Sequence, residues 1–374
     1  MEAIVQELAA LIEQHGWASK FQQALKLVAS RDVPSIESIR TLDDYLHHID
    51  AMVRWAPRES GDSRLVHDKL VEFYFLLDQA PLRALQSSIA PGANAAELTP
   101  LSRWIKRYAI AWGSYLDTTQ SAAHIESFRT NPAFRWDEYM PPPSGYLTFN
   151  QFFARHVRPG MRPIAAIGDA RVVISPADAN FIGAWPIGAD STIHVEDPAI
   201  DIKGMNWSIH QLLEGSAYAG RFDGGTFTHS ALRTYDYHRW HAPVPGKVVE
   251  ARVIQGHAFL DVVARPGTVD GKRQNVLCAV EGTGYQFVQT RGLVVIESPI
   301  GLVACLPVGM AQVSSVVITA AVGTTLHKGE EMGYFQFGGS DFVLVFERAS
   351  NVELTCRIDA HYAQGRVIGL CHPP

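Results

Sequence analysis

The sequence is poor in cysteine. Only four occur among 374 residues, and no two form a CxxC pair: Cys278, Cys305, Cys356 and Cys371. This spacing supplies neither a disulfide framework nor a zinc ribbon, so we expect reduced thiols. Glu2 and Glu7 are acidic where a secretory signal peptide would be basic, and we therefore expect a cytoplasmic protein.

The sequence also lacks a strong excess of charge. It has 32 Lys and Arg against 38 Asp and Glu, a formal net charge of -6. Residues 1–145 hold 14 basic and 18 acidic side chains, and the remainder holds 18 and 20. Neither part is basic, which argues against a nucleic-acid partner or a polybasic membrane anchor.

One long stretch without charge, residues 298–326, raises the question of membrane insertion. Prolines and glycines interrupt it, at Pro299, Gly301, Pro307, Gly309 and Gly323. A spanning helix needs about 20 continuous apolar residues, so this composition favours buried strands and turns. We expect no stable membrane anchor.

The chain is rich in apolar residues, at 47%, and their periodicity differs between its two parts. Residues 4–12, 65–77 and 102–116 repeat apolar side chains every three to four positions, which predicts helices. The run Pro141–Gly145 breaks helical structure and is the best candidate for a domain boundary in the chain. We therefore predict a helical N-terminal extension over residues 1–145.

Short β-branched runs separated by Gly and Pro turns dominate the remainder. The expected strands are 171–175, 247–254, 258–264, 292–297, 316–321 and 342–346. A short helix is expected at Ser208–Leu213. We predict an α+β protein whose residues 146–374 form a β-rich, sandwich-like domain.

The segment YFQFGGSDFVLVFE (334–347) contains two adjacent glycines. Taken alone, Gly338-Gly339-Ser340 between apolar runs is typical of a tight turn in a hairpin. The glycines would also let another group approach the Gly339 carbonyl closely.

A second segment, TYDYHRWHAPVPGKV (234–248), holds two histidines three residues apart. On a helical turn His238 and His241 would share a face, and on a strand or loop they would face different directions. They could ligate a metal, act as acid and base, or be structural. Asp178, in ISPADANF (174–181), could orient one imidazole and so complete an Asp–His–Ser arrangement that activates a nucleophile.

Five ordered motifs resemble the phosphatidylserine decarboxylase family. They are the SPAD segment, DYHRWHAPVPG, the GGS before VLVFE, FNQFFARHVRPGMRPI (149–164) and IKGMNWSIHQLLEG (202–215). The resemblance covers about residues 145–350. Two positions depart from the family pattern, because Asp341 stands where threonine is common and Ala179 stands where glycine is usual.

The resemblance implies a self-processing enzyme with a covalent pyruvoyl group derived from Ser340. The Ser340 hydroxyl would attack the Gly339 carbonyl, and the ester would eliminate to give two chains, 1–339 and 340–374. By carry-over, His241 is the base for Ser340, Asp178 orients His241, and His238 handles protons during decarboxylation. The pyruvoyl carbonyl would form a Schiff base with a substrate amine and accept electrons as carbon dioxide leaves.

The helical extension, including LDDYLHHIDAMVRWAP (42–57), resembles that of the phosphatidylserine-decarboxylase-like L-tryptophan decarboxylases. We therefore expect a soluble aromatic amino acid as substrate, tryptophan first, with phosphatidylserine as the alternative. Asp341 would repel a phosphodiester if it lay ionised beside the prosthetic group. The sequence is compatible with a homo-oligomer.

Two other classes compete with this prediction. One is a metal-dependent hydrolase with Asp178, His238 and His241 as ligands. The other is a binding protein that keeps the fold and never cleaves.

Overall fold

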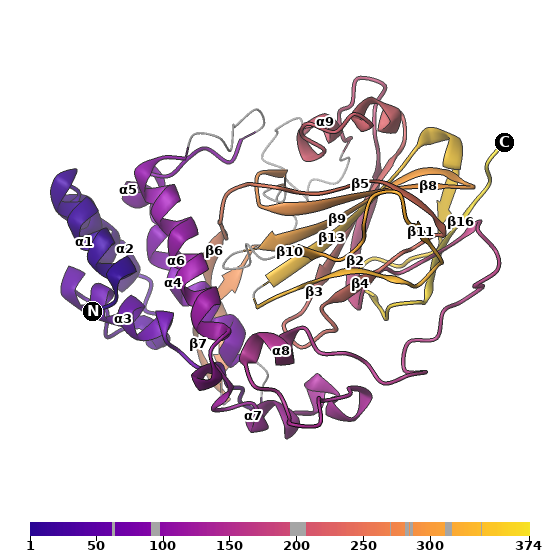
Figure 1. Ribbon diagram of the computed structural model, residues 1–374. Coiled ribbons are helices and arrows are strands. Elements are labelled where there is room, and N and C mark those ends of the chain that lie inside the picture. Colours follow the sequence, from indigo (N-terminus) through magenta and orange to yellow (C-terminus); the bar gives the residue numbers. More distant parts are fainter. Residues whose placement is uncertain are drawn as a thin grey trace.

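The structure, a computed structural model, has a helical N-terminal part beside a β-rich part (Figure 1). It describes residues 1–61, 64–90, 98–194, 207–269, 271–280, 284, 287–310, 316–337 and 339–374, without the side chains at 310 and 339. The predicted α+β class is confirmed. Gly338 and residues 202–206, which belong to two of the motifs above, lie outside the described residues.

The helical part forms because its long helices have apolar side chains to bury, on one face in most of them and on every side from Leu70 to Leu77. The helices are α1 (Ala3–Gln14), α2 (Ala18–Ala29), α3 (Leu42–Val53), α4 (Leu65–Leu77), α5 (Ala80–Arg83), α6 (Pro100–Leu116) and α7 (Glu126–Arg129). Helix α6 begins where Thr99 accepts a hydrogen bond from the Ser102 amide and proline occupies the first turn. Its apolar face, including Trp104 and Trp112, is fully buried, as the periodicity predicts.

Two short helices belong to the remainder, α8 (Phe149–Phe153) and α9 (Ile209–Leu212). Thr148 caps α8 through the Gln151 amide, and Ser208 caps α9 through the His210 amide. The predicted helix at Ser208–Leu213 is thereby confirmed.

Sixteen strands among the described residues form the β-rich part. They are β1 (Val172–Ile174), β2 (Ala179–Pro186), β3 (Thr226–Leu232), β4 (Arg239–His241), β5 (Gly246–Ile254), β6 (Val262–Val269), β7 (Lys272–Ala279), β8 (Arg291–Ser298), β9 (Gly301–Met310), β10 (Val316–Ile318), β11 (Thr325–Leu326), β12 (Glu331–Phe335), β13 (Gly339–Phe346), β14 (Val352–Leu354), β15 (His361–Tyr362) and β16 (Val367–Cys371).

Eight of these strands make the main antiparallel sheet, in the order β11-β5-β8-β9-β13-β3-β2-β15. Strand β13 is central, between β9 and β3. Its side chains alternate between two buried layers: Phe342 and Leu344 enter one hydrophobic cluster, and Val343 and Val345 enter the other. Burial on both faces explains the continuous apolar run VLVF.

The smaller sheet β10-β12-β4 packs against one face of the main sheet. Trp240 of β4 is fully buried, with its ring 6.1 Å from that of Phe342. Trp240 therefore packs beneath the sheet as core. Two further groups, β1-β16-β14 and the hairpin β6-β7, complete the part of the chain that the structure describes.

The helical and β-rich parts share one hydrophobic cluster, which runs from α1 to β16. Helix α4 packs on the hairpin β6-β7. The Asp78 carboxylate accepts a hydrogen bond from the Val262 amide at 2.8 Å, and the Arg83 guanidinium lies 4.0 Å from the Phe259 ring centre. The predicted boundary at residue 145 therefore falls within a chain that has a common core.

Two expectations need correction. Gly339 and Ser340 do not form a turn, because both lie in β13 and pair with β9, Gly339 opposite Met310 and Ser340 opposite Gly309. The strand expected at 258–264 begins only at Val262. No helix among the described residues combines the length and apolarity needed to cross a bilayer.

Candidate active site

Ser340 is the second residue of β13 and has little contact with solvent, at 1% exposed. Its neighbours in the sheet are Gly309 of β9 and Leu232 of β3. Because side chains alternate along a strand, Ser340 points to the same side as Phe342. The central position in the sheet holds the Gly339–Ser340 peptide in an extended conformation.

The side chain next to the Ser340 hydroxyl is His238. Ser340 Oγ lies 3.2 Å from His238 Nδ1, and His238 Nε2 lies 3.0 Å from the Arg233 carbonyl oxygen. A carbonyl only accepts, so Nε2 carries the proton and the lone pair on Nδ1 is directed at the hydroxyl. The contact therefore has the geometry of a nucleophile and its base.

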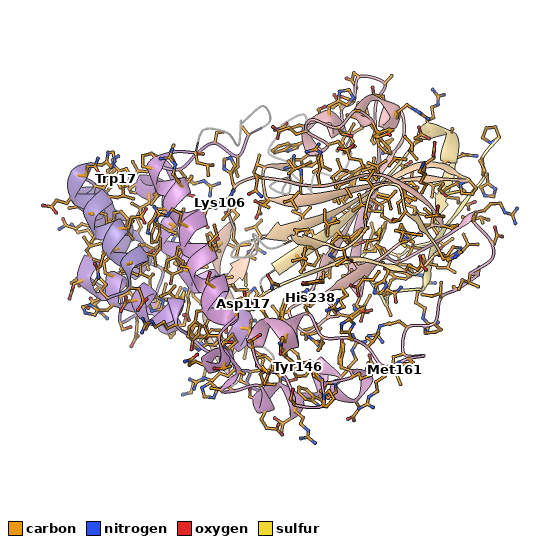
Figure 2. The ribbon with its side chains drawn as sticks, in the orientation of Figure 1. Trp17, Lys106, Asp117, Tyr146, Met161 and His238 are labelled. Atoms are coloured by element: carbon orange, nitrogen blue, oxygen red, sulfur yellow. The ribbon has the colours of Figure 1, made fainter. Side chains whose placement is uncertain are left out.

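The environment keeps His238 neutral. It is fully buried on the side of the β-rich part that faces the helices (Figure 2). Phe153 of α8 stacks on its ring at 3.9 Å between centres. Burial, assisted by the charge of Arg155, lowers the pKa of His238 to about 3. At pH 7 the imidazole can accept the hydroxyl proton.

His241 lies in β4 and has different partners. Its Nδ1 lies 2.9 Å from the Gly329 carbonyl oxygen, and its Nε2 lies 3.0 Å from the Tyr237 hydroxyl. The carbonyl can only accept, so Nδ1–H donates to it and Nε2 accepts a hydrogen bond from the Tyr237 hydroxyl. Burial lowers the pKa of His241 as well.

Asp178 follows β1 and is fully buried, with its carboxylate surrounded by donors. Arg162 binds it through two nitrogens, Nε to Oδ1 at 2.8 Å and Nη2 to Oδ2 at 2.6 Å. The Gln364 amide donates to Oδ1 at 2.8 Å and Arg135 Nη2 to Oδ2 at 3.1 Å. Burial by itself raises the pKa of Asp178, but the bonds and charge of Arg162 outweigh it and leave the pKa below its usual value.

The geometry therefore differs from the expected arrangement. The resemblance pairs His241 with Ser340 and with Asp178, whereas the structure places His238 at Ser340 and gives both nitrogens of His241 to other groups. His238 directly precedes β4 and His241 ends it, and residues three apart along an extended segment face opposite sides. The carboxylate of Asp178 accepts hydrogen bonds from Arg162 and Arg135 instead of orienting His241.

The metal-ligand alternative meets the same obstacle. Asp178 is bound by cations, and His238 and His241 direct their nitrogens to different protein groups. In the part of the chain that the structure describes, no group of three His, Cys, Asp or Glu side chains could hold a metal ion.

Asp341 is next to Ser340 in the chain, but it points to the opposite face of the sheet. Its Oδ2 lies 2.9 Å from His229 Nε2 of β3, and both side chains are buried. The acidic residue that departs from the family pattern therefore lies against a histidine on the far side of the strand from His238.

Sequence reasoning missed several residues that build this site. Arg162 lies within the motif FNQFFARHVRPGMRPI and could have been suspected from its two-nitrogen match to a carboxylate. Tyr237 is in the histidine motif. Arg135 and the aromatic contact of Phe153 gave no local signal, because both depend on the tertiary fold.

The residues present fit a pyruvoyl group derived from Ser340. The serine follows a glycine, is shielded from water, and has a neutral imidazole directed at its hydroxyl. These are the requirements for turning a serine within an intact chain into a nucleophile.

Comparisons with known proteins identify the family of the chain. The family model "Phosphatidylserine decarboxylase" matches residues 149–370. The chain is 30% identical to decarboxylase iboD of Amanita muscaria, covering 63% of this chain and 74% of that one. It is 28% identical to the phosphatidylserine decarboxylase proenzyme of Fusobacterium nucleatum, covering 63% and 72%.

Phosphatidylserine decarboxylase proenzyme 3 of Schizosaccharomyces pombe is 30% identical to the chain, which spans 24% of that longer protein. Because the family model covers more than half of the chain, membership is established. The chain belongs to the phosphatidylserine decarboxylase family, carboxy-lyases that are made as proenzymes and carry a covalently bound pyruvoyl group.

Proposed function

We propose that this protein cleaves itself between Gly339 and Ser340 and then decarboxylates a soluble aromatic L-amino acid, tryptophan first, to the amine and carbon dioxide. The observation that carries the proposal is the contact between Ser340 Oγ and His238 Nδ1 at 3.2 Å. Phosphatidylserine is the alternative substrate.

Self-cleavage begins with His238. Its Nδ1 accepts the hydroxyl proton while Ser340 Oγ bonds to the Gly339 carbonyl carbon. The bond between that carbon and the Ser340 nitrogen then breaks, and the nitrogen takes the proton from His238. The product is an ester that joins Gly339 to the Ser340 side chain.

Elimination separates the two chains. Loss of the Ser340 α-proton to a base and breakage of the Cβ–Oγ bond release residues 1–339 with a terminal carboxylate. The dehydroalanine left at position 340 tautomerises to an imine, and water replaces its nitrogen. Ammonia leaves and the pyruvoyl group remains at the start of residues 340–374.

In the mature enzyme the pyruvoyl group supplies a carbonyl that binds the substrate amine and draws electrons from the carboxylate carbon. His238 lies beside this position and holds or delivers a proton at Nδ1. Phe153 keeps the imidazole in place by stacking on it. The burial of His238 excludes water from the proton transfer.

The helices next to the cleavage site support a soluble substrate. Helices α6 and α8 cover the residue before the double glycine, since the Phe337 ring lies 5.6 Å from Trp112 and 5.3 Å from Phe149. This cover favours a small molecule that enters from water over a lipid presented by a bilayer. Acidic residues outnumber basic ones in both parts of the chain, which is also consistent with a soluble substrate.

The relatives that are named phosphatidylserine decarboxylase proenzymes support the alternative. The two substrates differ in what must reach Ser340. Phosphatidylserine brings a phosphodiester and two acyl chains, whereas tryptophan brings a free carboxylate and an indole that aromatic side chains can contact.

Denaturing mass spectrometry of purified protein tests self-cleavage. We expect fragments 1–339 and 340–374, the second with a pyruvoyl terminus, and an intact chain in Ser340→Ala. An intact wild-type chain in freshly purified, active protein would contradict the proposal.

Release of labelled carbon dioxide tests the substrate. Carboxyl-labelled tryptophan in buffer is compared with carboxyl-labelled phosphatidylserine in mixed micelles, using the same preparation. Ser340→Ala controls for contaminating decarboxylases. A higher kcat/KM for the phospholipid would overturn the tryptophan assignment and leave the self-cleavage proposal standing.

A further inference from the structure

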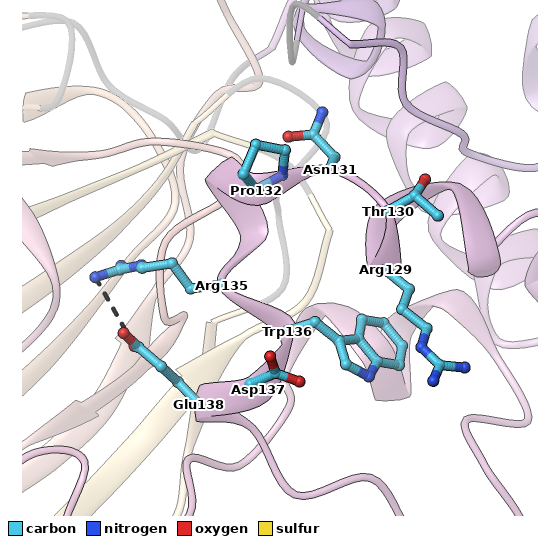
Figure 3. Close-up of a pocket in the computed structure, with 8 residues that line it drawn as sticks. All are labelled: Arg129, Thr130, Asn131, Pro132, Arg135, Trp136, Asp137 and Glu138. Carbon is cyan, nitrogen blue, oxygen red and sulfur yellow. Dashed lines mark ion pairs between the residues drawn. The ribbon is translucent and has the colours of Figure 1, made fainter.

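Arg135 precedes the part of the chain that the family model matches and reaches into the candidate active site. It lies between the short 3-10 helices Pro132–Phe134 and Trp136–Glu138. Figure 3 shows its side chain extending away from Trp136, with an ion pair to Glu138 at 3.8 Å. The surrounding hollow, about 550 Å³, is lined by residues 129–132 and 135–138.

The guanidinium joins two buried acids of the catalytic part. Its Nη2 lies 3.1 Å from Asp178 Oδ2 and 3.6 Å from Asp236 Oδ1. Both carboxylates are at most 1% exposed. Arg162 also binds Asp178 and His361 lies 3.0 Å from Asp236, so the part of Arg135 is to bridge the two carboxylates and reduce their mutual repulsion.

Asp236 controls the turn that holds His238. Its Oδ2 accepts from the Arg233 amide at 2.8 Å, and its own amide donates to the Arg233 carbonyl oxygen at 3.0 Å. The same Arg233 carbonyl accepts the Nε2 proton of His238. A continuous series of contacts therefore runs from Arg135 through Asp236 and this turn to the imidazole at Ser340.

The backbone of Arg135 is in the left-handed region, with φ 45° and ψ 47°. That conformation is unfavourable for a residue with a Cβ and suits glycine better. A glycine would therefore relax the backbone at this position. What an arginine provides here, and a glycine does not, is the side chain that contacts the two acids.

We propose that Arg135 is a positioning residue for self-cleavage, which holds the Arg233–Asp236 turn and so fixes His238 against Ser340. The inference rests on the proposed self-cleavage. Through it, the segment before the matched domain takes part in the maturation of the enzyme.

The test follows the appearance of fragment 340–374 from full-length chain made by cell-free synthesis. We expect Arg135→Gly to fold and to cleave about 100-fold more slowly, because a displacement of about 1 Å in a catalytic group costs that much. Propylguanidinium added to Arg135→Gly should restore most of the rate, since Arg135 lines the hollow and its removal opens a path from there to both acids. Arg135→Lys should restore part of it.

Arg129→Met is the matched control. Arg129 lines the same hollow, is 59% exposed and pairs with Glu126 at 3.4 Å. Its loss should leave the rate unchanged. Melting temperatures of each variant in the Ser340→Ala background show whether the fold is retained.

If Arg135→Gly cleaved itself at the wild-type rate, the inference would be overturned. A slow variant that neither lysine nor propylguanidinium restores would also overturn it. If Arg135→Gly does not fold, Arg135→Lys and Arg135→Gln decide: a faster lysine variant supports the inference and equal rates overturn it. If wild-type protein itself never cleaves, the proposed function fails first, which separates the two failures.

Discussion

At the scale of single residues, His238 and His241 differ in what their free lone pairs face. The lone pair of His238 is directed at Ser340, and that of His241 at the Tyr237 hydroxyl. We expect His238→Ala to slow self-cleavage by about 10²- to 10⁴-fold, the usual contribution of a general base. His241→Ala should have the smaller effect.

Time courses of fragment formation by denaturing gel measure this difference. His238→Gln and His241→Gln serve as companions that keep hydrogen-bonding capacity without a comparable base. If His241→Ala proved the more defective variant, the base role would return to His241 and the contact seen in the uncut chain would not be the reactive one.

The pKa of His238 predicts an unusual pH dependence. Since burial lowers it from 6.5 to about 3, the imidazole stays neutral as the pH falls through the ordinary histidine range. Self-cleavage should therefore be nearly constant from about pH 8 to about pH 5 and decline only in stronger acid. A pH jump applied to newly synthesised chain measures the rate.

Two neighbouring groups bear on this profile. Burial lowers the pKa of His241, so it too stays neutral, whereas the hydrogen bond to Asp236 raises the pKa of His361. His361→Gln removes the group that would titrate first. An inflection near pH 6.5 that persists in this variant would show that His238 has an ordinary pKa.

The sequence named Ser340, Asp178 and both histidines, but the resemblance paired Ser340 with His241, whereas the structure places His238 beside it. The choice of imidazole depends on how β4 is placed by its pairing with β12, where Trp240 lies opposite Gly333. That register is a long-range contact, and no local pattern contains it. Arg135 is hidden for the same reason, because its two acids lie 43 and 101 residues further along the chain.

At the scale of elements, Asn150 of α8 links α6 to Phe337, which precedes the strand that carries Ser340. Its Nδ2 donates to Asp117 Oδ1 at the end of α6 at 2.9 Å, and its Oδ1 accepts from the Phe337 amide at 3.2 Å. Asn150 is 4% exposed, so each of these bonds is shielded from water. The bond that Asn150 donates to Asp117 sets which way the amide points.

We expect Asn150→Asp to destabilise this junction and slow cleavage. The new carboxylate would face Asp117 without a donor, and a buried unsatisfied polar group costs about 1–3 kcal/mol. Urea unfolding in the Ser340→Ala background measures the free energy, and the Ser340 chain gives the cleavage rate. Gln151→Glu is the matched control, since its side-chain oxygen still accepts from the Leu147 amide.

Local patterns predicted the helices α4 and α6 and the strands β5, β8 and β13. Apolar residues recur every three to four positions in the helices, and the strands are short runs rich in β-branched and apolar residues. The patterns failed at Gly339–Ser340, where glycines suggested a turn. The strand continues there because β9 and β3 flank it on both sides and complete its hydrogen bonds. A sheet of order β9-β13-β3 joins segments far apart in sequence, which periodicity cannot detect.

At the scale of the whole molecule, the shared hydrophobic core couples the unfolding of the helical part to that of the β-rich part. Trp112 is fully buried and contacts Phe337, and Asp78 binds the Val262 amide across the junction. Each large buried side chain contributes about 1.5–3 kcal/mol, so separating the parts removes a large share of a domain's stability.

We therefore expect one cooperative transition when uncut Ser340→Ala chain is heated in a calorimeter, with equal calorimetric and van't Hoff enthalpies. A chain of residues 146–374 alone should fail to fold, because it would expose Phe337 and the face of β6-β7 that α4 covers. Two separate transitions, or a soluble folded fragment 146–374, would show instead that the predicted boundary at residue 145 divides independent domains. The helical part would then be an accessory to the catalytic part, and its contacts with the cleavage site would not be required for the fold.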